Sequence, residues 1–300
     1  MNILITGASG FVGSHLSRFL LEKAWQVTGI GTSRQSPLSR DEHFTWISAD
    51  TTQPGAWQKA VPRADVIVNL AGRTIFKRWT KAYKKQMQAS RILTTRNLVA
   101  ALPPDGDSVF LSTSAVGLYG SRGGDILTED TTAGDDFLAA LSTDWENEAR
   151  QAENCGARVA LMRFGVVLAA GGGALGKMVP AFRMFAGGPV GNGRHWFPWI
   201  HMTDLIGAIE FIISREDLSG PFNFVAPGQI RNVDFARTLG KSLGRPAVMP
   251  APAIMLRLLL GEMGNTLLSS QRAVPERLQR AGFDFQFPDA AQALEDLFGK

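Results

Sequence analysis

The chain has 300 residues, of which 45% are hydrophobic and 19% are charged, and its formal net charge is +4. This composition is typical of a folded globular protein and excludes a disordered one. No Lys/Arg run reaches the density of a nucleic-acid-binding patch, so we expect no nucleic-acid partner. The single cysteine, Cys155, excludes an intramolecular disulfide and a metal site of several cysteines, and we expect no metal.

The apolar segments of the chain are short. Residues 1–6 are too few for the core of a signal peptide. The longest late apolar stretch, Ala251–Leu260, is interrupted by Arg257 and falls well short of a membrane span. We therefore expect a cytoplasmic protein without a membrane partner.

Apolar, strand-like runs alternate with amphipathic stretches through the first two-thirds of the chain. Strands are predicted at Ile3–Thr6, Val27–Ile30, Phe44–Ser48, Val66–Leu70, Val109–Ser112 and Val159–Phe164. Helices are predicted at Val12–Lys23, Ala56–Val61, Lys81–Ala101 and Asp144–Asn154. Continuous apolar strands separated by helices indicate an α/β fold with a parallel sheet covered on both faces. Right-handed crossovers then give a doubly wound sheet.

A glycine-rich turn follows the first predicted strand, where Thr6 leads into the sequence Gly-Ala-Ser-Gly-Phe-Val-Gly. The first glycine, Gly7, permits the tight turn, and Gly10 lets backbone amides approach a pyrophosphate. Gly13 lets the following helix pack closely on the sheet, and the positive end of that helix faces the anion. We therefore predict a dinucleotide site formed by Gly7, Ser9, Gly10, Phe11, Val12 and Gly13.

The end of the second predicted strand favours NADP over NAD. An NAD site places an acidic residue there to bind the adenosine ribose. This strand instead ends in Gly31-Thr32-Ser33-Arg34, without a carboxylate. Ser33 and Arg34 can receive a 2′-phosphate through a hydroxyl and a guanidinium. We therefore predict NADP as the cofactor; the alternative is that Arg34 is a solvated loop residue.

Two further segments fit the same cofactor. Asp50 follows the third predicted strand and can reach the adenine amino group. Leu70, Ala71 and Gly72 follow the fourth strand, where a ribose must lie against the backbone. Both segments also suit ordinary turns, so turn chemistry remains the alternative explanation.

The sequence changes character after Gly165. Glycines at 171–173 and 187–193 predict loops over a pocket, and residues 234–299 predict a helix-rich tail. We therefore expect a Rossmann-type, NADP-binding domain over residues 1–165, to which parts of 195–230 return. Residues 166–194 and 231–300 are expected to form a small C-terminal lobe that meets the substrate.

These motifs together resemble a known family. The glycine turn, Asp50, Asn69–Gly72 and Ser112–Ser114 are similar in order to the extended short-chain dehydrogenase/reductases. The match is sharper for the atypical "epimerase family" subgroup, which is NAD-dependent epimerase/dehydratase-like. It is carried by Arg78–Thr80, Ser90-Arg91, Ser114–Gly120, Trp145-Glu146, Arg163–Leu168, Trp199–His201 and a tail similar to the subgroup's C-terminal domain of unknown function. The resemblance implies a Rossmann-type NADP-binding protein, and we add Arg163 to the cofactor-binding residues.

One feature of that superfamily is missing. Its reductases and epimerases use a Tyr-x-x-x-Lys pair, in which the phenol moves a proton at the substrate oxygen. The lysine lowers the pKa of the phenol and holds the nicotinamide ribose. The corresponding helix carries Trp145 and Ala149 at these positions. An indole N–H is no acid–base group at neutral pH, and alanine has no charge. Neither Tyr83 nor Tyr119 is followed by lysine four residues later.

Three hypotheses about function remain. In the first, the protein is an oxidoreductase or sugar-nucleotide-type epimerase of unknown substrate, and Ser114, or Thr113 if the register shifts, polarises a carbonyl. A substitute then carries the proton, for which the candidates are Tyr119, Glu146, Lys177 and His201. In the second, the protein is a non-catalytic NADP-binding regulator or sensor. In the third, it supports another protein in an assembly and the cofactor is structural.

The predicted catalytic residues are Ser114 and Tyr119, although each candidate alone also fits a structural role. His201, for example, directly precedes a helix start, where it can pack beside the cap. The expected partner is an unknown small-molecule substrate, and an anion would suit the scattered cations Arg73, Arg78, Arg91, Lys177 and Arg194. We expect a monomer or a homodimer.

Overall fold

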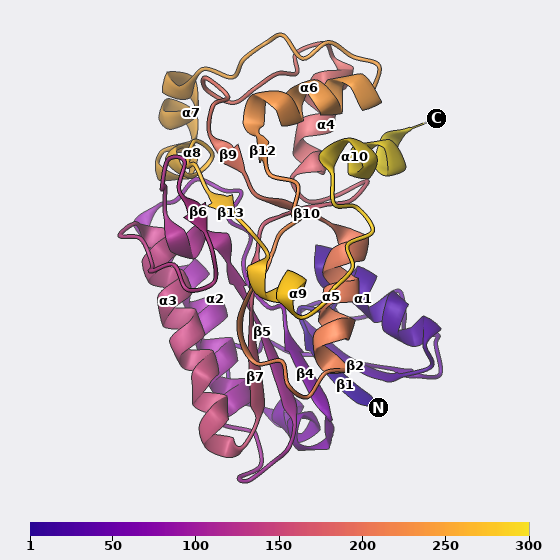
Figure 1. Ribbon diagram of the computed structural model, residues 1–300. Helices are drawn as coiled ribbons and strands as arrows, with labels where there is room; N and C mark the ends of the chain where they lie inside the picture. Colours follow the sequence, from indigo (N-terminus) through magenta and orange to yellow (C-terminus); the bar gives the residue numbers. More distant parts are fainter. Residues whose placement is uncertain (300) are drawn as a thin grey trace.

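The computed structural model describes residues 1–299 (Figure 1). At the centre of its larger lobe lies a seven-stranded sheet with the order β11-β7-β5-β4-β1-β2-β3, in which every neighbouring pair is parallel. The strands are β1 (Asn2–Thr6), β2 (Gln26–Gly31), β3 (Phe44–Ser48), β4 (Val66–Asn69), β5 (Val109–Ala115), β7 (Arg158–Phe164) and β11 (Gly220–Phe224). The predicted doubly wound parallel α/β sheet is confirmed.

Helices cover both faces of this sheet, as Figure 1 shows. Their bounds are α1 (Phe11–Glu22), η1 (Ala56–Arg63), α2 (Lys81–Val99), α3 (Phe137–Arg150), η3 (Gln151–Cys155) and α5 (Met202–Ile213). Alternate residues of the strands feed two separate cores, because successive side chains of a strand point to opposite faces. In β1, Ile3 and Ile5 pack with α1 and α5, whereas Leu4 packs with η1, α2 and α3.

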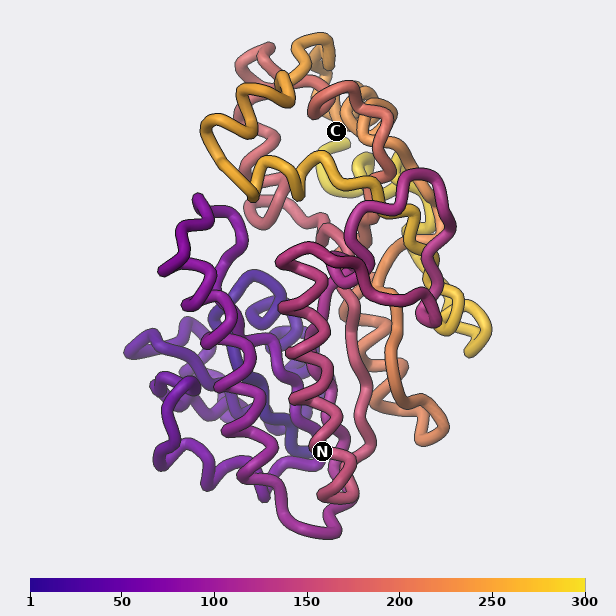
Figure 2. The backbone as a smooth tube through the Cα atoms, turned by 90° about the vertical axis from the view of Figure 1, so that its left-hand side faces the viewer, coloured from indigo at the N-terminus to yellow at the C-terminus, as the bar shows by residue number. Residues whose placement is uncertain are grey.

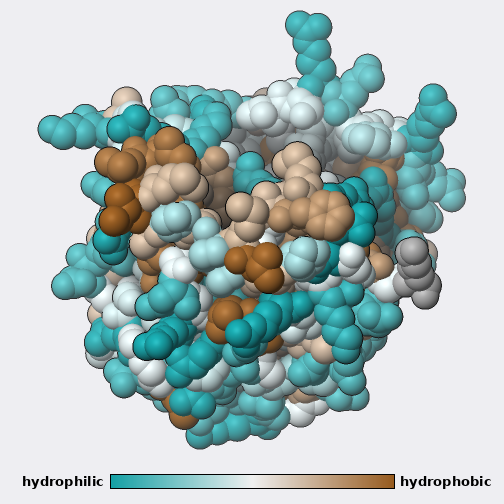
Figure 3. Space-filling model, turned by 90° about the horizontal axis from the view of Figure 1, so that it is seen from above, coloured by the Kyte–Doolittle hydropathy of each residue, from teal (hydrophilic) through white to brown (hydrophobic). Residues whose placement is uncertain are grey.

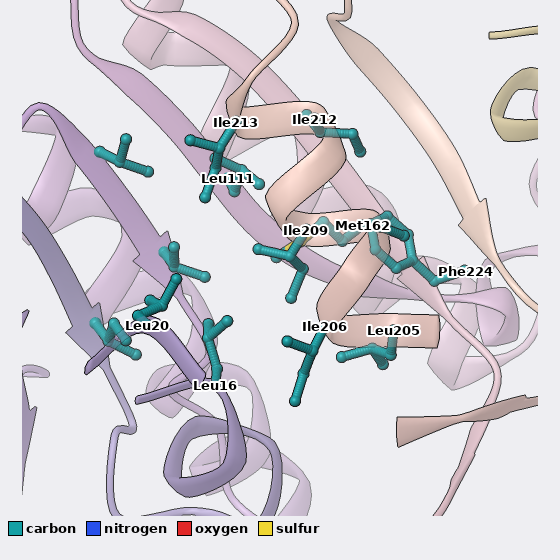
Figure 4. Close-up of a cluster of buried hydrophobic side chains, with 14 of the residues drawn as sticks. Leu16, Leu20, Leu111, Met162, Leu205, Ile206, Ile209, Ile212, Ile213 and Phe224 are labelled. Carbon is teal, nitrogen blue, oxygen red and sulfur yellow. The ribbon is translucent and has the colours of Figure 1, made fainter. Parts of the chain in front are cut away.

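The α5 helix completes the first of these cores. Figure 4 shows its apolar side chains lying between Leu16 and Leu20 of α1 and the strand residues Leu111 and Met162. Both α5 and β11 fall within the stretch 195–230 that we expected to return to the larger domain. The exact domain boundaries stay a prediction.

The predicted strands and helices lie within a few residues of the observed ones, except for α3. A helix was predicted over Asp144–Asn154, but α3 begins at Phe137, about two turns earlier. The N-cap residue explains this start, because the side chain of Asp136 accepts a hydrogen bond from the backbone N–H of Ala139 at 2.9 Å. The predicted start of this helix was therefore wrong.

A second lobe lies above the C-terminal edge of the sheet (Figures 1 and 2). Its main elements are β8 (Val166–Leu168), α4 (Leu175–Arg183), β9 (Trp196–Phe197), β10 (Trp199–His201), β12 (Ile230–Arg231), α6 (Asn232–Ser242), α7 (Ala253–Leu260), α8 (Glu262–Thr266) and α10 (Ala290–Phe298). It has its own apolar core, in which Leu168, Phe182, Trp199, Phe235 and Leu294 pack together. Of the remaining elements, η2 (Val116–Tyr119) directly follows β5, β6 (Ile126–Leu127) pairs with β13 (Arg272–Ala273), and α9 (Glu276–Arg280) packs against β11 at the edge of the sheet.

The surface of the second lobe carries exposed apolar side chains. Figure 3 looks down on this lobe and shows several hydrophobic side chains at its surface. Those on or beside α7 include Val248, Met249, Ile254, Leu258 and Leu259. No helix among residues 1–299 combines the length and the apolar character that a membrane crossing requires.

Candidate functional site

A cleft of about 490 Å³ opens at the C-terminal edge of the sheet. Its walls come from the ends of β1, β2, β3 and β4 and from one side of α2. They include Gly7, Ser9, Gly10, Thr32, Asp50, Thr51, Leu70, Ala71, Gly72, Arg73, Gln86, Ser90 and Thr94. The strand order reverses at β1, since β2 follows on one side and β4 lies on the other. In open α/β sheets this switch point is where ligands bind.

The glycines of the first turn leave no room for side chains. Gly7 has φ +70°, and a Cβ built on it would lie 2.9 Å from the carbonyl oxygen of Leu70. A Cβ on Gly13 would lie 2.3 Å from the carbonyl oxygen of Gly7, so the helix packs directly on the turn. Gly10 is the N-cap of α1, and no side chain caps this helix. Its first-turn N–H groups therefore form an anion site beside the cleft.

A loop of the second lobe covers the start of α1. A Cβ on Gly172 would lie 2.5 Å from the Phe11 ring, and one on Gly173 would lie 2.6 Å from it. Of the predicted cofactor residues, Phe11, Val12 and Gly13 therefore belong to the helix end behind the cleft wall.

The residues predicted to distinguish NADP from NAD lie at the outer end of the cleft. Thr32 lines it, and the next two residues, Ser33 and Arg34, are solvent-exposed. The Trp46 indole N–H donates to the carbonyl oxygen of Ser33 at 3.1 Å. Asp50 both lines the cleft and closes a turn, because its Oδ1 accepts hydrogen bonds from the backbone N–H and the hydroxyl of Thr52.

A buried polar network lies behind the cleft at the ends of β5 and β7. The Arg163 guanidinium donates to both carboxylate oxygens of Glu146, from Nε at 2.8 Å and from Nη2 at 2.9 Å. Ser114 Oγ donates to the same carboxylate at 2.7 Å. The Tyr119 hydroxyl accepts from Arg163 Nη1 at 2.9 Å and donates to Asn223 Oδ1 at 2.6 Å. All five side chains are buried.

Burial and charge fix the protonation states of this network. Burial raises the pKa of Tyr119 to about 12, and the nearby Arg163 only partly offsets this rise. Burial alone would lower the pKa of Arg163, but its hydrogen bonds to Glu146 and the charge of that carboxylate raise it above its usual range. At neutral pH the phenol is therefore neutral and the guanidinium is charged.

The network changes the roles that the sequence predicted. Every guanidinium nitrogen of Arg163 already donates to a protein acceptor, including the carbonyl oxygen of Glu129 at 2.8 Å. This geometry shows a structural role for Arg163, and its predicted contact with the cofactor stays a prediction. Ser114 and Tyr119 are 1% and 0% exposed, and neither lines the cleft. Their predicted catalytic role has no support from this placement and stays a prediction.

The protonation state of Tyr119 can be measured directly. In a Tyr83→Phe variant Tyr119 is the one remaining tyrosine of the chain, so the alkaline rise in phenolate absorbance reports on it alone. We expect a midpoint near pH 12, because burial raises this pKa to about 12. Near-ultraviolet circular dichroism monitors folding throughout. A midpoint near pH 10 in the still-folded protein would contradict the burial argument.

Of the other candidate catalytic residues, some lie in the core and one lies on the surface. His201 is the N-cap of α5, and its Nδ1 accepts the backbone N–H of Thr203 at 3.3 Å. Its ring is buried against Phe287, which fits the structural alternative, and its role as a proton carrier stays a prediction. Lys177 of α4 is exposed, and its Nζ lies 5.8 Å from the centre of the Phe76 ring. Thr113 Oγ1 is buried and has no hydrogen-bond partner within residues 1–299.

The two positions of the missing tyrosine and lysine are filled by packing. Trp145 is buried between α3 and α2, and its indole N–H donates to Thr95 Oγ1 at 2.9 Å. The guanidinium carbon of Arg91 lies 5.1 Å from the centre of the indole ring. Ala149 is fully buried in the core between α3 and the sheet. We find no ionisable group of α3 at these two positions.

One wall of the cleft was missed by the sequence prediction. Gln86, Ser90 and Thr94 of α2 line it, together with Thr51 after β3. The signal was present, because these three helix positions are spaced by four and therefore share one face. A polar face on a helix that must also pack against a sheet indicates a ligand-facing surface. Within residues 1–299, no group of three or more His, Cys, Asp or Glu side chains is placed to hold a metal ion.

The switch-point cleft, the glycine turn and the parallel sheet define a Rossmann-type nucleotide-binding α/β protein. Residues 3–224 match the model of the NAD dependent epimerase/dehydratase family, and residues 251–297 match a domain of unknown function (DUF1731). The chain therefore belongs to the NAD-dependent epimerase/dehydratase family.

Similar proteins span the same length. An epimerase family protein of Staphylococcus epidermidis is 37% identical over 98% of both chains. The crystal structure of the human epimerase family protein SDR39U1 with NADPH is 31% identical, covers 99% of both chains and superimposes with a TM-score of 0.87. A nucleoside-diphosphate sugar epimerase from Corynebacterium glutamicum is also 31% identical, with a TM-score of 0.78; our chain covers 58% of it.

Proposed function

We propose that the protein binds NADP(H) in the cleft and is an oxidoreductase or sugar-nucleotide-type epimerase acting on a small molecule. The observation that carries this proposal is the course of the cleft. It runs from the exposed segment at Thr32, past the N-terminus of α1 at Gly10, to the turn at Gly72. A dinucleotide needs such a path, with an anion site in the middle and a narrow backbone-lined part on each side.

The residues at the outer end of the cleft favour NADP over NAD. No carboxylate follows β2 to bind a ribose 2′-hydroxyl, and exposed Ser33 and Arg34 offer a hydroxyl and a guanidinium instead. The NADPH present in the similar human structure supports the same choice. When bound, the nicotinamide supplies hydride transfer. The residues of this chain bind and orient it.

A change at Arg34 tests the choice of cofactor. Arg34→Ala is expected to weaken NADPH binding about tenfold and to leave NADH binding unchanged, because one charge-assisted hydrogen bond is lost. Titration of protein fluorescence with each nucleotide measures both affinities. Arg40→Ala, an exposed cation of the same loop, is the matched control and should change neither. A wild-type protein that binds NADH more tightly than NADPH would contradict the proposal.

Cations near the inner end of the cleft favour an anionic substrate. Arg73 lines the cleft, and Lys177 reaches Phe76 from the second lobe. These groups combine positive charge with an aromatic surface, which suits a small molecule that carries a phosphate or a carboxylate.

A non-catalytic NADP-binding regulator is the second candidate. Trp145 and Ala149 fill the positions of the proton-transfer pair, and Ser114 is hydrogen-bonded to Glu146 behind the cleft. Screening carbonyl compounds and sugar nucleotides for NADPH oxidation, NADP reduction or epimerised product separates the two functions. Turnover of any compound in this panel supports the enzyme hypothesis. Tight NADPH binding without turnover across the panel supports the regulator.

A further inference from the structure

Arg91 lies on α2, and its guanidinium contacts Gly72 and Arg73, which line the inner end of the cleft. Its Nη1 donates to the carbonyl oxygen of Met87 and its Nη2 to that of Arg73, both at 3.1 Å. A Cβ built on Gly72 would lie 3.2 Å from the guanidinium carbon. The guanidinium therefore stands directly against the turn after β4, whose residues Gly72 and Arg73 line the cleft.

The charge of Arg91 has no counter-charge in the protein. No carboxylate of residues 1–299 lies within 4.0 Å of its nitrogens, and both of its hydrogen-bond acceptors are neutral carbonyls. Arg96, five residues later, instead pairs with Glu148 at 2.8 Å and faces solvent. Burial lowers the pKa of Arg91 to about 10, so the group stays charged at neutral pH in a place that disfavours charge. An anion beside it would remove this cost.

Trp145 holds this cation in place. The guanidinium lies over the indole ring at 5.1 Å, and the indole is itself fixed by its hydrogen bond to Thr95. A cation–π contact of this kind is strongest when both groups are desolvated. The residue at the position of the missing tyrosine therefore orients a cation supplied by the neighbouring helix.

The strand order places Arg91 at the nicotinamide half of the proposed cofactor path. The outer end of the cleft lies at β2 and β3, the anion site at β1, and Gly72 at the end of β4. A dinucleotide whose adenosine lies near Asp50 and whose pyrophosphate lies near Gly10 must continue toward β4 and β5. The turn at Gly72, against which Arg91 packs, lies at the end of β4 on this side.

We propose that Arg91 is a cofactor-binding residue that contacts the ribose–phosphate of the nicotinamide half, taking over the charge of the absent lysine. The inference rests on the proposed function. The Arg91–Trp145 pair binds and orients the cofactor but exchanges no proton, because the guanidinium remains protonated and the indole is no acid–base group. In this protein, cofactor binding, which the lysine of the Tyr-x-x-x-Lys pair usually provides, is thus kept without the proton transfer that the tyrosine provides.

Two ligands of different length test this assignment. NADPH spans the whole path, whereas 2′,5′-ADP carries only the adenosine half. Arg91→Met is expected to weaken NADPH binding at least tenfold, since charge-assisted hydrogen bonds are lost, and to leave 2′,5′-ADP binding within twofold of wild type. Isothermal titration calorimetry measures both affinities. Arg96→Met, on the same helix but outside the cleft, is the matched control and should change neither.

The outcomes of these titrations distinguish a failure of the role proposed for Arg91 from a failure of the proposed function. Unchanged NADPH affinity in folded Arg91→Met, or an equal loss of 2′,5′-ADP affinity, overturns the role of Arg91 and leaves the proposed function standing. A wild-type protein that binds neither NADPH nor NADH overturns both. If Arg91→Met does not fold, Arg91→Gln removes the charge and keeps an amide donor for the carbonyl of Arg73. The same selective loss of NADPH is then expected, and its absence overturns the inference.

Discussion

Replacing Arg163 by methionine is expected to lower the free energy of unfolding by about 3–5 kcal/mol, the usual cost of breaking a buried ion pair. The Glu146 carboxylate would keep its hydrogen bond from Ser114 but lose two charge-assisted ones from Arg163. The Tyr119 hydroxyl would lose a donor as well. Urea denaturation followed by circular dichroism measures the change.

Two variants show whether the cost comes from an unpaired buried charge. Combining Arg163→Met with Glu146→Leu should recover part of the lost stability, because two apolar groups replace two charges and none remains unpaired. Arg96→Met, which breaks the exposed pair with Glu148, should cost less than about 1 kcal/mol. A loss below about 1 kcal/mol in Arg163→Met would show that the buried pair does not stabilise the fold.

Replacing Gly13 by alanine is expected to reduce NADPH affinity by about 100-fold. The new Cβ would lie 2.3 Å from the carbonyl oxygen of Gly7 and 2.8 Å from the Cα of Ala8, and both of these are backbone atoms. The helix must then move away from the turn, which displaces the N–H groups of its first turn from the anion site. Calorimetric titration with NADPH measures the loss.

Gly124→Ala is the matched control for this change. A Cβ on Gly124 meets nothing within 4 Å, and its backbone does not lie in the left-handed region. This variant should bind NADPH as the wild type does, and its thermal unfolding temperature should be unchanged. NADPH affinity within threefold of wild type in Gly13→Ala would show that this glycine is not required by the cofactor site.

Much of the larger lobe was predictable because its signals are local. Each predicted strand is a mainly apolar run, and each run lies within a strand of the sheet to within one residue. The start of α3 was missed because it depends on a single cap at Asp136, eight residues before the stretch where the helix was expected. Local capping signals are weak when no apolar periodicity accompanies them.

The sequence predicted the residues that line the cleft but not the buried network around Arg163. The turn from Gly7 to Gly13 and the residues Asp50 and Gly72 follow strands directly, and parallel strands bring their ends to one edge. The network around Arg163 joins residues up to 104 positions apart. No local pattern records such partners, so the sequence could not show that the guanidinium of Arg163 pairs with Glu146.

By itself, then, the sequence determined a dinucleotide-type turn, a parallel α/β sheet and the absence of a Tyr-x-x-x-Lys pair at Trp145 and Ala149. These features depend on residue type and short-range spacing. Only the tertiary structure decided which polar groups face the cleft and which neutralise one another behind it. Burial and counter-charge come from residues distant in the chain: Arg163 is paired with Glu146, whereas Arg91 lies over the Trp145 ring and donates only to neutral carbonyls.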